Sequence, residues 1–217
     1  MSVKYWGLYA SQPCRTVLYT LRRLGIEYQH NEIRPRFDTR ADWFKKGYNR
    51  YGYAPVLEYE GVKMIESASI SRFLWAKYDS EELIMPRKDL IRRQKVDSIL
   101  DVNLYRYRPV LMQSYWDIIL SPIWFGSKKP SDEQCAQTMK RVHNNFKDIN
   151  TLSPDTEYLT GDNMTLADLQ VYNEVKNWTH HFELDLEEYP WIKKWWDRMH
   201  SDALIAELDD KMIWRLY

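Results

Sequence analysis

The pattern of hydrophobic and polar positions changes near residue 80. Before that point, short runs with the alternation typical of β-strands recur at 3–9, 26–33, 56–59 and 62–65. Apolar residues three and four apart predict helices over 13–24 and 67–78. A further short helix is expected to contain Trp43. Glu60-Gly61 predicts a tight hairpin turn. The order of elements indicates an α/β domain with a small mixed sheet.

After residue 80 only helical patterns remain, over roughly 89–119, 132–152, 166–180 and 190–200. Pro109 lies inside the first of these and should kink or interrupt it. The charged stretch 81–88 contains Pro86 and indicates a linker. We therefore expect an α/β domain over 1–80 and an all-helical domain over 89–217.

Charge and composition remove several classes of function. The 31 acidic and 31 basic residues balance and form no basic block, so no nucleic acid or anionic membrane partner is expected. No apolar run approaches the length of a membrane span, and no metal site is expected. The 10 Trp and 16 Tyr residues suit core packing, or a pocket for flat apolar ligands.

The two cysteines, Cys14 and Cys135, are too few for a disulfide framework. The first residues lack the charged and apolar regions of a signal peptide. A reducing, intracellular location follows as an expectation. We expect the cytoplasm, although an organelle matrix would suit the same features.

Ser11-Gln12-Pro13-Cys14-Arg15 lies between the first strand and the first helix. A polar side chain there faces the free N–H groups and partial positive charge of a helix N-terminus, which favour an anion such as a thiolate. The spacing overlays a Cys-x-x-Cys redox motif in which Ser11 replaces the nucleophilic cysteine, so disulfide exchange is not expected. Ser11 either donates a hydrogen bond to a bound thiolate or simply caps the helix.

Two further motifs have both a structural and a functional interpretation. Ala54-Pro55 begins a strand, where a proline is ordinary but can also shape a ligand-binding backbone. Glu66-Ser67 directly precedes a helix, where Ser67 can act as an N-cap or hold a carboxylate, and Glu66 can meet an ammonium group.

The stretch Met164 to Leu169 predicts a helix start without chemistry. Thr165 is expected to cap the helix, and Asp168 at the third helical position to bond back to the backbone of Thr165. Met164 is expected to pack on Leu169. These motifs, in this order, resemble the cytosolic glutathione transferases, and the resemblance covers the whole chain. It implies a thioredoxin-like N-terminal domain that binds glutathione, followed by an all-α domain that binds an electrophile.

The resemblance implies attack by the glutathione thiolate on electrophilic, mostly apolar substrates, with glutathione as co-substrate and no cofactor. Ser11 matches the activating serine of the theta and delta classes. Tyr5 is the alternative, because the mu and sigma classes use a tyrosine on the first strand. The resemblance also implies a cis peptide bond before Pro55, which turns the backbone of Ala54 toward glutathione, and an acidic residue contributed by a dimer partner. The implied glutathione-binding residues are eight. They are Trp43, Lys46, Tyr53, Ala54, Pro55, Glu66, Ser67 and Asp101.

Several positions depart from the family pattern and leave the class open. Tyr53 replaces a basic residue, the lysines after Trp43 come one residue early, and Asp101 substitutes for an acid expected at Tyr105. The implied electrophile pocket has apolar walls, with Arg108 as a group that needs an anion. Its expected residues are Tyr105, Arg108, Met112, Trp116 and Trp214.

A twofold homodimer is implied as well. Two other functions stay open: a non-catalytic binding or structural protein on the same fold, and a glutathione-dependent isomerase or dehalogenase.

Overall fold

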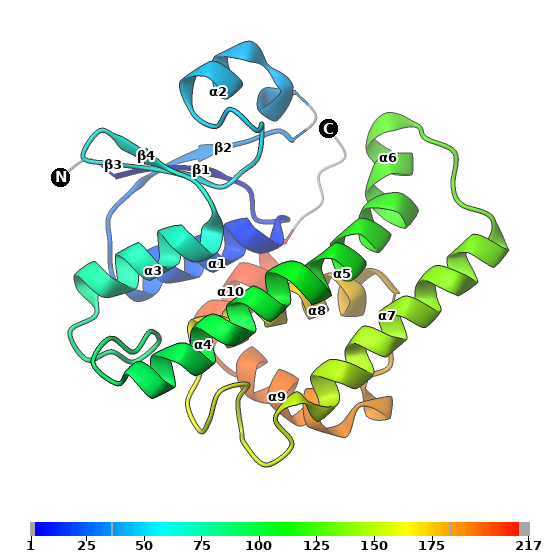
Figure 1. Ribbon diagram of the computed structural model, residues 1–217. Coiled ribbons are helices and arrows are strands. Elements are labelled where there is room, and N and C mark those ends of the chain that lie inside the picture. Colours follow the sequence, from blue (N-terminus) through cyan, green and yellow to red (C-terminus); the bar gives the residue numbers. More distant parts are fainter. Residues whose placement is uncertain (1–2, 36, 183, 213–217) are drawn as a thin grey trace. The chain divides into compact units, whose positions relative to one another are not determined.

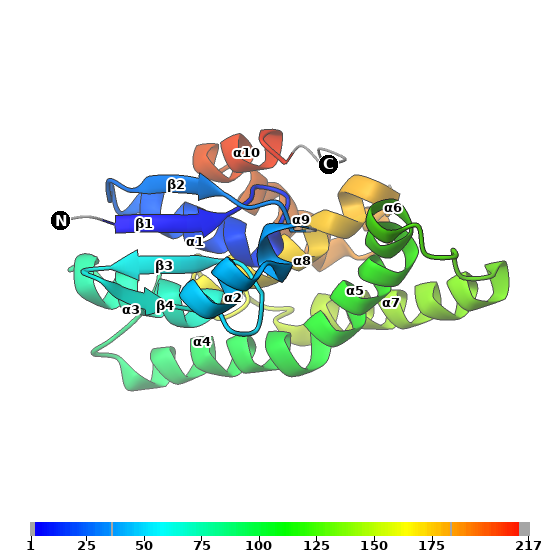
Figure 2. The same ribbon diagram turned by 90° about the horizontal axis from the view of Figure 1, so that it is seen from above.

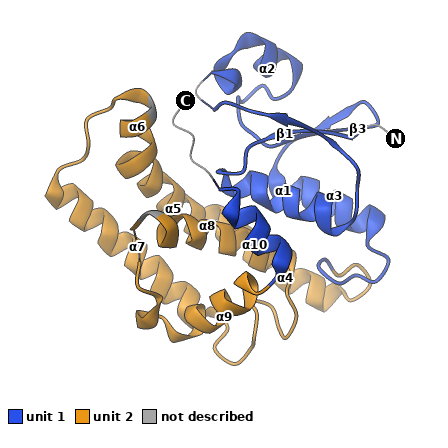
Figure 3. Ribbon diagram, turned by 180° about the vertical axis from the view of Figure 1, so that it is seen from behind, with its two compact units in different colours: residues 1–85, 202–215, 217 blue, residues 86–201, 216 orange. Residues whose placement is uncertain are grey.

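The computed structural model describes residues 3–35, 37–182 and 184–212 (Figure 1). The chain forms two compact units (Figure 3). The first takes in the chain up to Met85 and again from Asp202, and the second takes in Pro86–Ser201. The first unit thus also includes the described residues 202–212, whereas the expected domains over 1–80 and 89–217 stay a prediction.

The first unit is built on a four-stranded mixed sheet, in the order β2-β1-β3-β4. β1 and β2 are parallel, and the other neighbouring pairs are antiparallel. The strands are β1 (Val3–Gly7), β2 (Gln29–Glu32), β3 (Val56–Tyr59) and β4 (Val62–Met64). β2 is shorter than its sequence pattern, because it pairs on one side only, with four residues of β1.

The predicted turn between β3 and β4 is confirmed. Glu60 has φ 50° and Gly61 has φ 80°, and a two-residue turn with both φ angles positive matches the twist of a hairpin. The parallel pairing of β1 and β2 requires a crossover, which the first helix provides.

Helices cover both faces of this sheet (Figures 1 and 2). α1 (Gln12–Arg23) and α3 (Ser67–Tyr78) pack side by side on one face. On the other, Phe44 of α2 (Asp42–Gly47) joins an apolar cluster with Trp6 and Val56. Neighbouring residues on a strand face opposite ways, so Tyr5 and Trp6 belong to different layers. The short 3₁₀ turn η1 (Asp38–Arg40) leads into α2.

The sequence pattern missed α10 (Ala203–Asp210). It belongs to the first unit and packs against α1. Asp202 caps it by accepting bonds from the N–H groups of Leu204 and Ile205, and accepts a 3.1 Å bond from the hydroxyl of Tyr19. The guanidinium of Arg22 on α1 lies 2.7 Å from the carboxylate of Glu207.

The second unit, in its described residues, has helices as its regular structure, apart from one isolated antiparallel bridge between Tyr158 and Gly161. Its helices are α4 (Leu90–Val102), α5 (Arg108–Tyr115), α6 (Ser121–Phe125), α7 (Asp132–Leu152), α8 (Leu166–Phe182) and α9 (Pro190–His200), with a 3₁₀ turn η4 (Leu186–Glu188) before α9. α4, α5 and α6 follow one another as one bent rod (Figure 1).

Two π-helical turns make these bends, η2 (Asn103–Tyr107) and η3 (Trp116–Leu120). Each directly precedes a helix with a proline in its first turn, Pro109 or Pro122. A proline cannot donate an N–H bond and clashes with the carbonyl four residues earlier. The interruption predicted at Pro109 is therefore confirmed as a wide turn that keeps the helix going.

Two carboxylates, one of them fully buried, join segments of this unit. Asp168 accepts four bonds, from the N–H groups of Leu159 and Thr165, the hydroxyl of Thr165 and the indole of Trp195. Its predicted place in the helix start is confirmed. Burial nevertheless raises the pKa of this carboxyl group.

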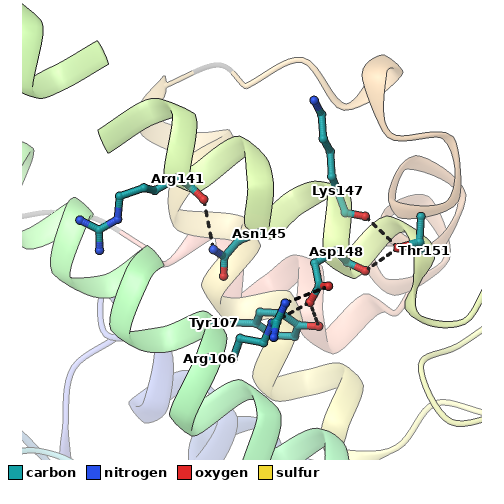
Figure 4. A network of polar contacts seen from close by, with 7 residues as sticks. All are labelled: Arg106, Tyr107, Arg141, Asn145, Lys147, Asp148 and Thr151. Carbon is teal, nitrogen blue, oxygen red and sulfur yellow. Dashed lines mark hydrogen bonds and ion pairs between the residues drawn. The ribbon is translucent and has the colours of Figure 1, made fainter. Parts of the chain in front are cut away.

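A second carboxylate ties η2 to α7. Figure 4 shows Arg106 and Tyr107 reaching Asp148, with Nε to Oδ2 at 3.1 Å and the phenol to Oδ2 at 2.9 Å.

Candidate functional site

Ser11 occupies the N-cap position of α1, in extended conformation, yet its side chain makes no capping hydrogen bond. Simple helix capping therefore does not account for this hydroxyl. Ser11 is partly exposed, whereas Cys14 is completely buried. Burial raises the pKa of the Cys14 thiol, and a hydrogen bond with the side chain of Ser11 offsets part of that rise. Cys14 is thus a protonated structural thiol beside the Ser11 hydroxyl.

Tyr5 lies in the core of the first unit. Its side chain is fully buried, and its phenol donates a 3.1 Å bond to the carbonyl oxygen of Cys14. A Cβ atom on Gly7 would come 2.0 Å from that phenol oxygen, so glycine is required for the close approach. Burial raises the pKa of Tyr5 well above its usual range. The phenol has a protein partner and no exposed surface to offer a ligand.

Arg15 holds the loop in front of Ser11. The side chain is buried, and its Nη1 atom lies 3.1 Å from the carbonyl oxygens of both Tyr9 and Ala10. The same atom lies 2.9 Å from the sulfur of Met212. The sequence left the partner of Arg15 open, because none of these contacts follows from local spacing.

The loop before β3 carries a cis peptide bond between Ala54 and Pro55. The predicted isomer is confirmed. Pro55 is buried, Ala54 is partly buried and Tyr53 is 70 % exposed. The buried amide of Asn49 braces this loop, donating 2.8 Å to the carbonyl of Tyr53 and accepting from the N–H of Tyr51. The sequence assigned no role to Asn49, since only the fold reveals that its side chain is buried.

Glu66 and Ser67 mark the junction of β4 and α3. Glu66 is exposed, occupies the N-cap position and has φ 68°. That left-handed conformation is uncommon for a residue with a side chain and points to a function. Ser67 is partly buried and is the first residue of α3. The cap position thus belongs to Glu66 and not to Ser67, contrary to the structural interpretation of the motif.

Trp43 and Lys46 lie on α2. Trp43 is half-exposed, with its ring edge-on to Phe44 and Tyr48. Lys46 forms an ion pair of 2.8 Å with Asp42, one turn earlier on the same helix. Both partners are exposed, so this pair contributes little and leaves Lys46 available to an anion.

In the second unit, the predicted anion for Arg108 is supplied by the protein. Arg108 forms an ion pair with Glu174 of α8, whose side chain is almost fully buried. Asp101 on α4 and Tyr105 on η2 are exposed, whereas Met112 and Trp116 are partly buried. Trp214 lies outside the described residues. Whether these side chains form a pocket stays a prediction.

Within the described residues, no three His, Cys, Asp or Glu side chains are grouped as a metal ion would need. The described helices include none that is long and apolar enough to cross a membrane. The chemical features of the first unit are thus a hydroxyl at a helix N-terminus, a cis-proline loop and an acidic residue in a left-handed conformation.

Two family models match the chain. The glutathione S-transferase N-terminal domain covers residues 6–82, and the glutathione S-transferase C-terminal domain covers residues 107–202. The chain belongs to the glutathione S-transferase family. Its thioredoxin-like sheet followed by an all-helical region is the fold expected from the sequence.

Known proteins similar to this chain come from plants, animals and bacteria. A probable glutathione S-transferase GSTF1 of Oryza sativa subsp. japonica is 26 % identical over 95 % of this chain and 94 % of its own length. The crystal structure of glutathione transferase F7 from Populus trichocarpa superposes with a TM-score of 0.86 at 18 % identity, covering 98 % and 100 % of the two chains. The structure of human glutathione-S-transferase T1-1 in its apo form superposes with a TM-score of 0.88 at 21 % identity. The match covers 97 % of this chain and 89 % of the human one.

Proposed function

We propose that this protein is a glutathione transferase that joins the thiolate of glutathione to electrophilic, mostly apolar substrates. The observation that carries the proposal is the Ser11 hydroxyl. It stands at the N-terminus of α1, makes no capping bond to the backbone, and has the buried Cys14 side chain as its hydrogen-bond partner. The partial positive charge of that helix end favours the same anion that a hydroxyl can bind.

The energy required is within reach of this arrangement. A free thiol has a pKa near 8.5, and lowering it by about two units requires roughly 2.7 kcal/mol of selective thiolate stabilisation. One hydrogen bond to a charged acceptor contributes about 1.5–3 kcal/mol. Ser11 and the N-terminus of α1 are together sufficient, and holding the second substrate nearby supplies the remaining acceleration.

The peptide part of glutathione has its own candidate contacts in the same unit. The backbone of Ala54 before cis-Pro55 can pair with an extended peptide. Glu66 and Ser67, with the N–H groups of the first turn of α3, suit the ammonium and carboxylate of a γ-glutamyl group. Trp43 and Lys46 suit the glycine carboxylate, while Tyr53 contributes contact area.

The second substrate and the assembly belong to the same proposal. The electrophile would contact Tyr105, Met112 and Trp116, with Arg108 fixed by Glu174 as a supporting residue. The protein would act as a homodimer, to which Asp101 contributes from the partner. We place the reaction in the cytoplasm, in keeping with the two free thiols, Cys14 and Cys135.

Two variants test which hydroxyl activates glutathione. Ser11→Ala should raise the pKa of the bound glutathione thiol by about one to two units and lower turnover at neutral pH about tenfold or more. Tyr5→Phe should leave that pKa unchanged, because the phenol of Tyr5 donates its hydrogen bond to the carbonyl oxygen of Cys14. The thiolate absorbance of the binary complex, titrated against pH, measures both.

The result that would refute this assignment is a titration that moves with Tyr5→Phe and not with Ser11→Ala. Glutathione binding without turnover of any electrophile would instead favour a non-catalytic role. Turnover confined to isomerisation or dehalogenation would favour the remaining alternative.

A further inference from the structure

Met212, the last described residue, belongs to the first unit and contacts Arg15, the residue that supports the Ser11 loop. α10 packs against α1, and Met212 follows it. The side chain of Met212 is buried and places its sulfur 2.9 Å from Nη1 of Arg15. The contact joins two residues 197 positions apart in the sequence.

Arg15 is the link between this contact and the loop. Its Nη1 atom also donates to the carbonyl oxygens of Tyr9 and Ala10, each at 3.1 Å. These two residues immediately precede Ser11, whose own carbonyl accepts a 3.0 Å bond from the backbone N–H of Arg15. A guanidinium is planar and rigid. The position of the Arg15 guanidinium therefore fixes the positions of the two loop carbonyls that it binds.

We propose that Arg15 is a positioning residue for Ser11, and that Met212 of the C-terminal segment sets the position of Arg15. Met212 thus acts on the thiolate site through Arg15 and the loop carbonyls. This inference rests on the proposed role of Ser11, because its effect is read through the glutathione thiol.

Independent anchors keep α10 in place when the Met212 contact is changed. Tyr19 donates 3.1 Å to Asp202 at the start of the helix. Glu207 pairs with Arg22 of α1 at 2.7 Å, and also with Lys211. A variant at Met212 can therefore disturb Arg15 without detaching the helix, and a variant at Glu207 can loosen the helix without touching Arg15.

The test compares Met212→Ala with Met212→Leu, which restores the buried volume. Met212→Ala should raise the pKa of the bound glutathione thiol by about half a unit, an approximately threefold smaller thiolate to thiol ratio at neutral pH. Met212→Leu should raise that pKa by less than Met212→Ala does, because it keeps the buried volume and loses only the sulfur. Calorimetry should give an unchanged glutathione dissociation constant for both, since the peptide ends are bound elsewhere.

Two further variants separate this route from general loosening. Arg15→Lys keeps the charge but loses the planar fork, and should raise the thiol pKa by about one unit. Glu207→Gln weakens the docking of α10 at the surface and should leave that pKa where it was. Thermal unfolding confirms that each variant is folded at the temperature of the titration.

The outcomes are distinct. A thiol pKa unchanged in both Met212→Ala and Arg15→Lys, while Ser11→Ala moves it, overturns this inference and leaves the proposed function standing. Equal shifts in Glu207→Gln and Met212→Ala overturn the route through Arg15. A titration that Ser11→Ala does not affect overturns the proposed role of Ser11 and this inference together.

Discussion

The backbone of Glu66 is held at φ 68° at a point where a side chain carries a cost. Glycine would adopt the same conformation freely. A glutamate there is retained at the expense of stability, which suggests that its carboxylate serves binding. Ser67, the next residue, begins α3, so both side chains lie at the N-terminus of that helix.

Substituting Glu66 should therefore separate stability from binding. Glu66→Gly should leave the free energy of unfolding unchanged or raise it by about 1 kcal/mol, because the positive φ is no longer strained. Glutathione affinity should fall with the loss of the carboxylate. Urea unfolding and calorimetry on the same preparation measure the two quantities.

Glu66→Gln is the matched control, since it keeps the strain and removes only the charge. It should weaken glutathione binding by about 1–3 kcal/mol, as should Ser67→Ala, because each leaves a charged group of the ligand unmet. Undiminished affinity in all three variants would remove both residues from the glutathione site.

At the scale of the element, the start of α8 depends on one buried carboxylate. Asp168 receives donors from the loop before the helix, from Thr165 and from the indole of Trp195 on α9. Three separate pieces of chain thus meet at one side chain. Such a group stabilises only while all of its donors are satisfied.

Asp168→Ala should lower the free energy of unfolding by about 3–5 kcal/mol, because the donors of Leu159, Thr165 and Trp195 are left buried without an acceptor. Asp162→Ala, at an exposed position in the preceding loop, should change it by less than about 0.5 kcal/mol. Chemical unfolding of both variants is the measurement, and similar losses for the two would contradict the special role of Asp168.

At the scale of the molecule, the second unit exposes large apolar side chains on one run of helix. Leu90 and Ile91 on α4 are 72 % and 73 % exposed, and Leu104 on η2 is 49 % exposed. Apolar surface of this kind is typical of an interface. It fits the proposed homodimer, in which α4 and η2 would be covered by a second copy.

Sedimentation at micromolar concentration should give about twice the chain mass of 26.3 kDa. Ile91→Asp should shift the protein toward the monomer, since it would place a charge in the interface. Ile123→Asp, at an exposed apolar position on α6, should leave the dimer intact. A fully active wild-type monomer would refute the shared site and exclude Asp101 from it.

The sequence by itself determined the elements whose signals are local. The helices at Ser67–Tyr78, Asp132–Leu152 and Pro190–His200 begin and end where their periodicity predicted. The hairpin at Glu60-Gly61 and the start of α8 also follow from chemistry within a few residues. Short-range spacing and backbone preference suffice for such features, and family motifs added cis-Pro55.

Only the tertiary structure decided which groups are available and which are already paired. Tyr5 and Ser11 were rivals in the sequence, but the pleat of β1 directs Tyr5 into the core and onto Cys14. Arg108 pairs with the carboxylate of Glu174, 66 positions away, and Arg15 contacts the thioether of Met212. The physical reason is the same in each case: burial and partner depend on contacts between distant parts of the chain, which local pattern does not encode.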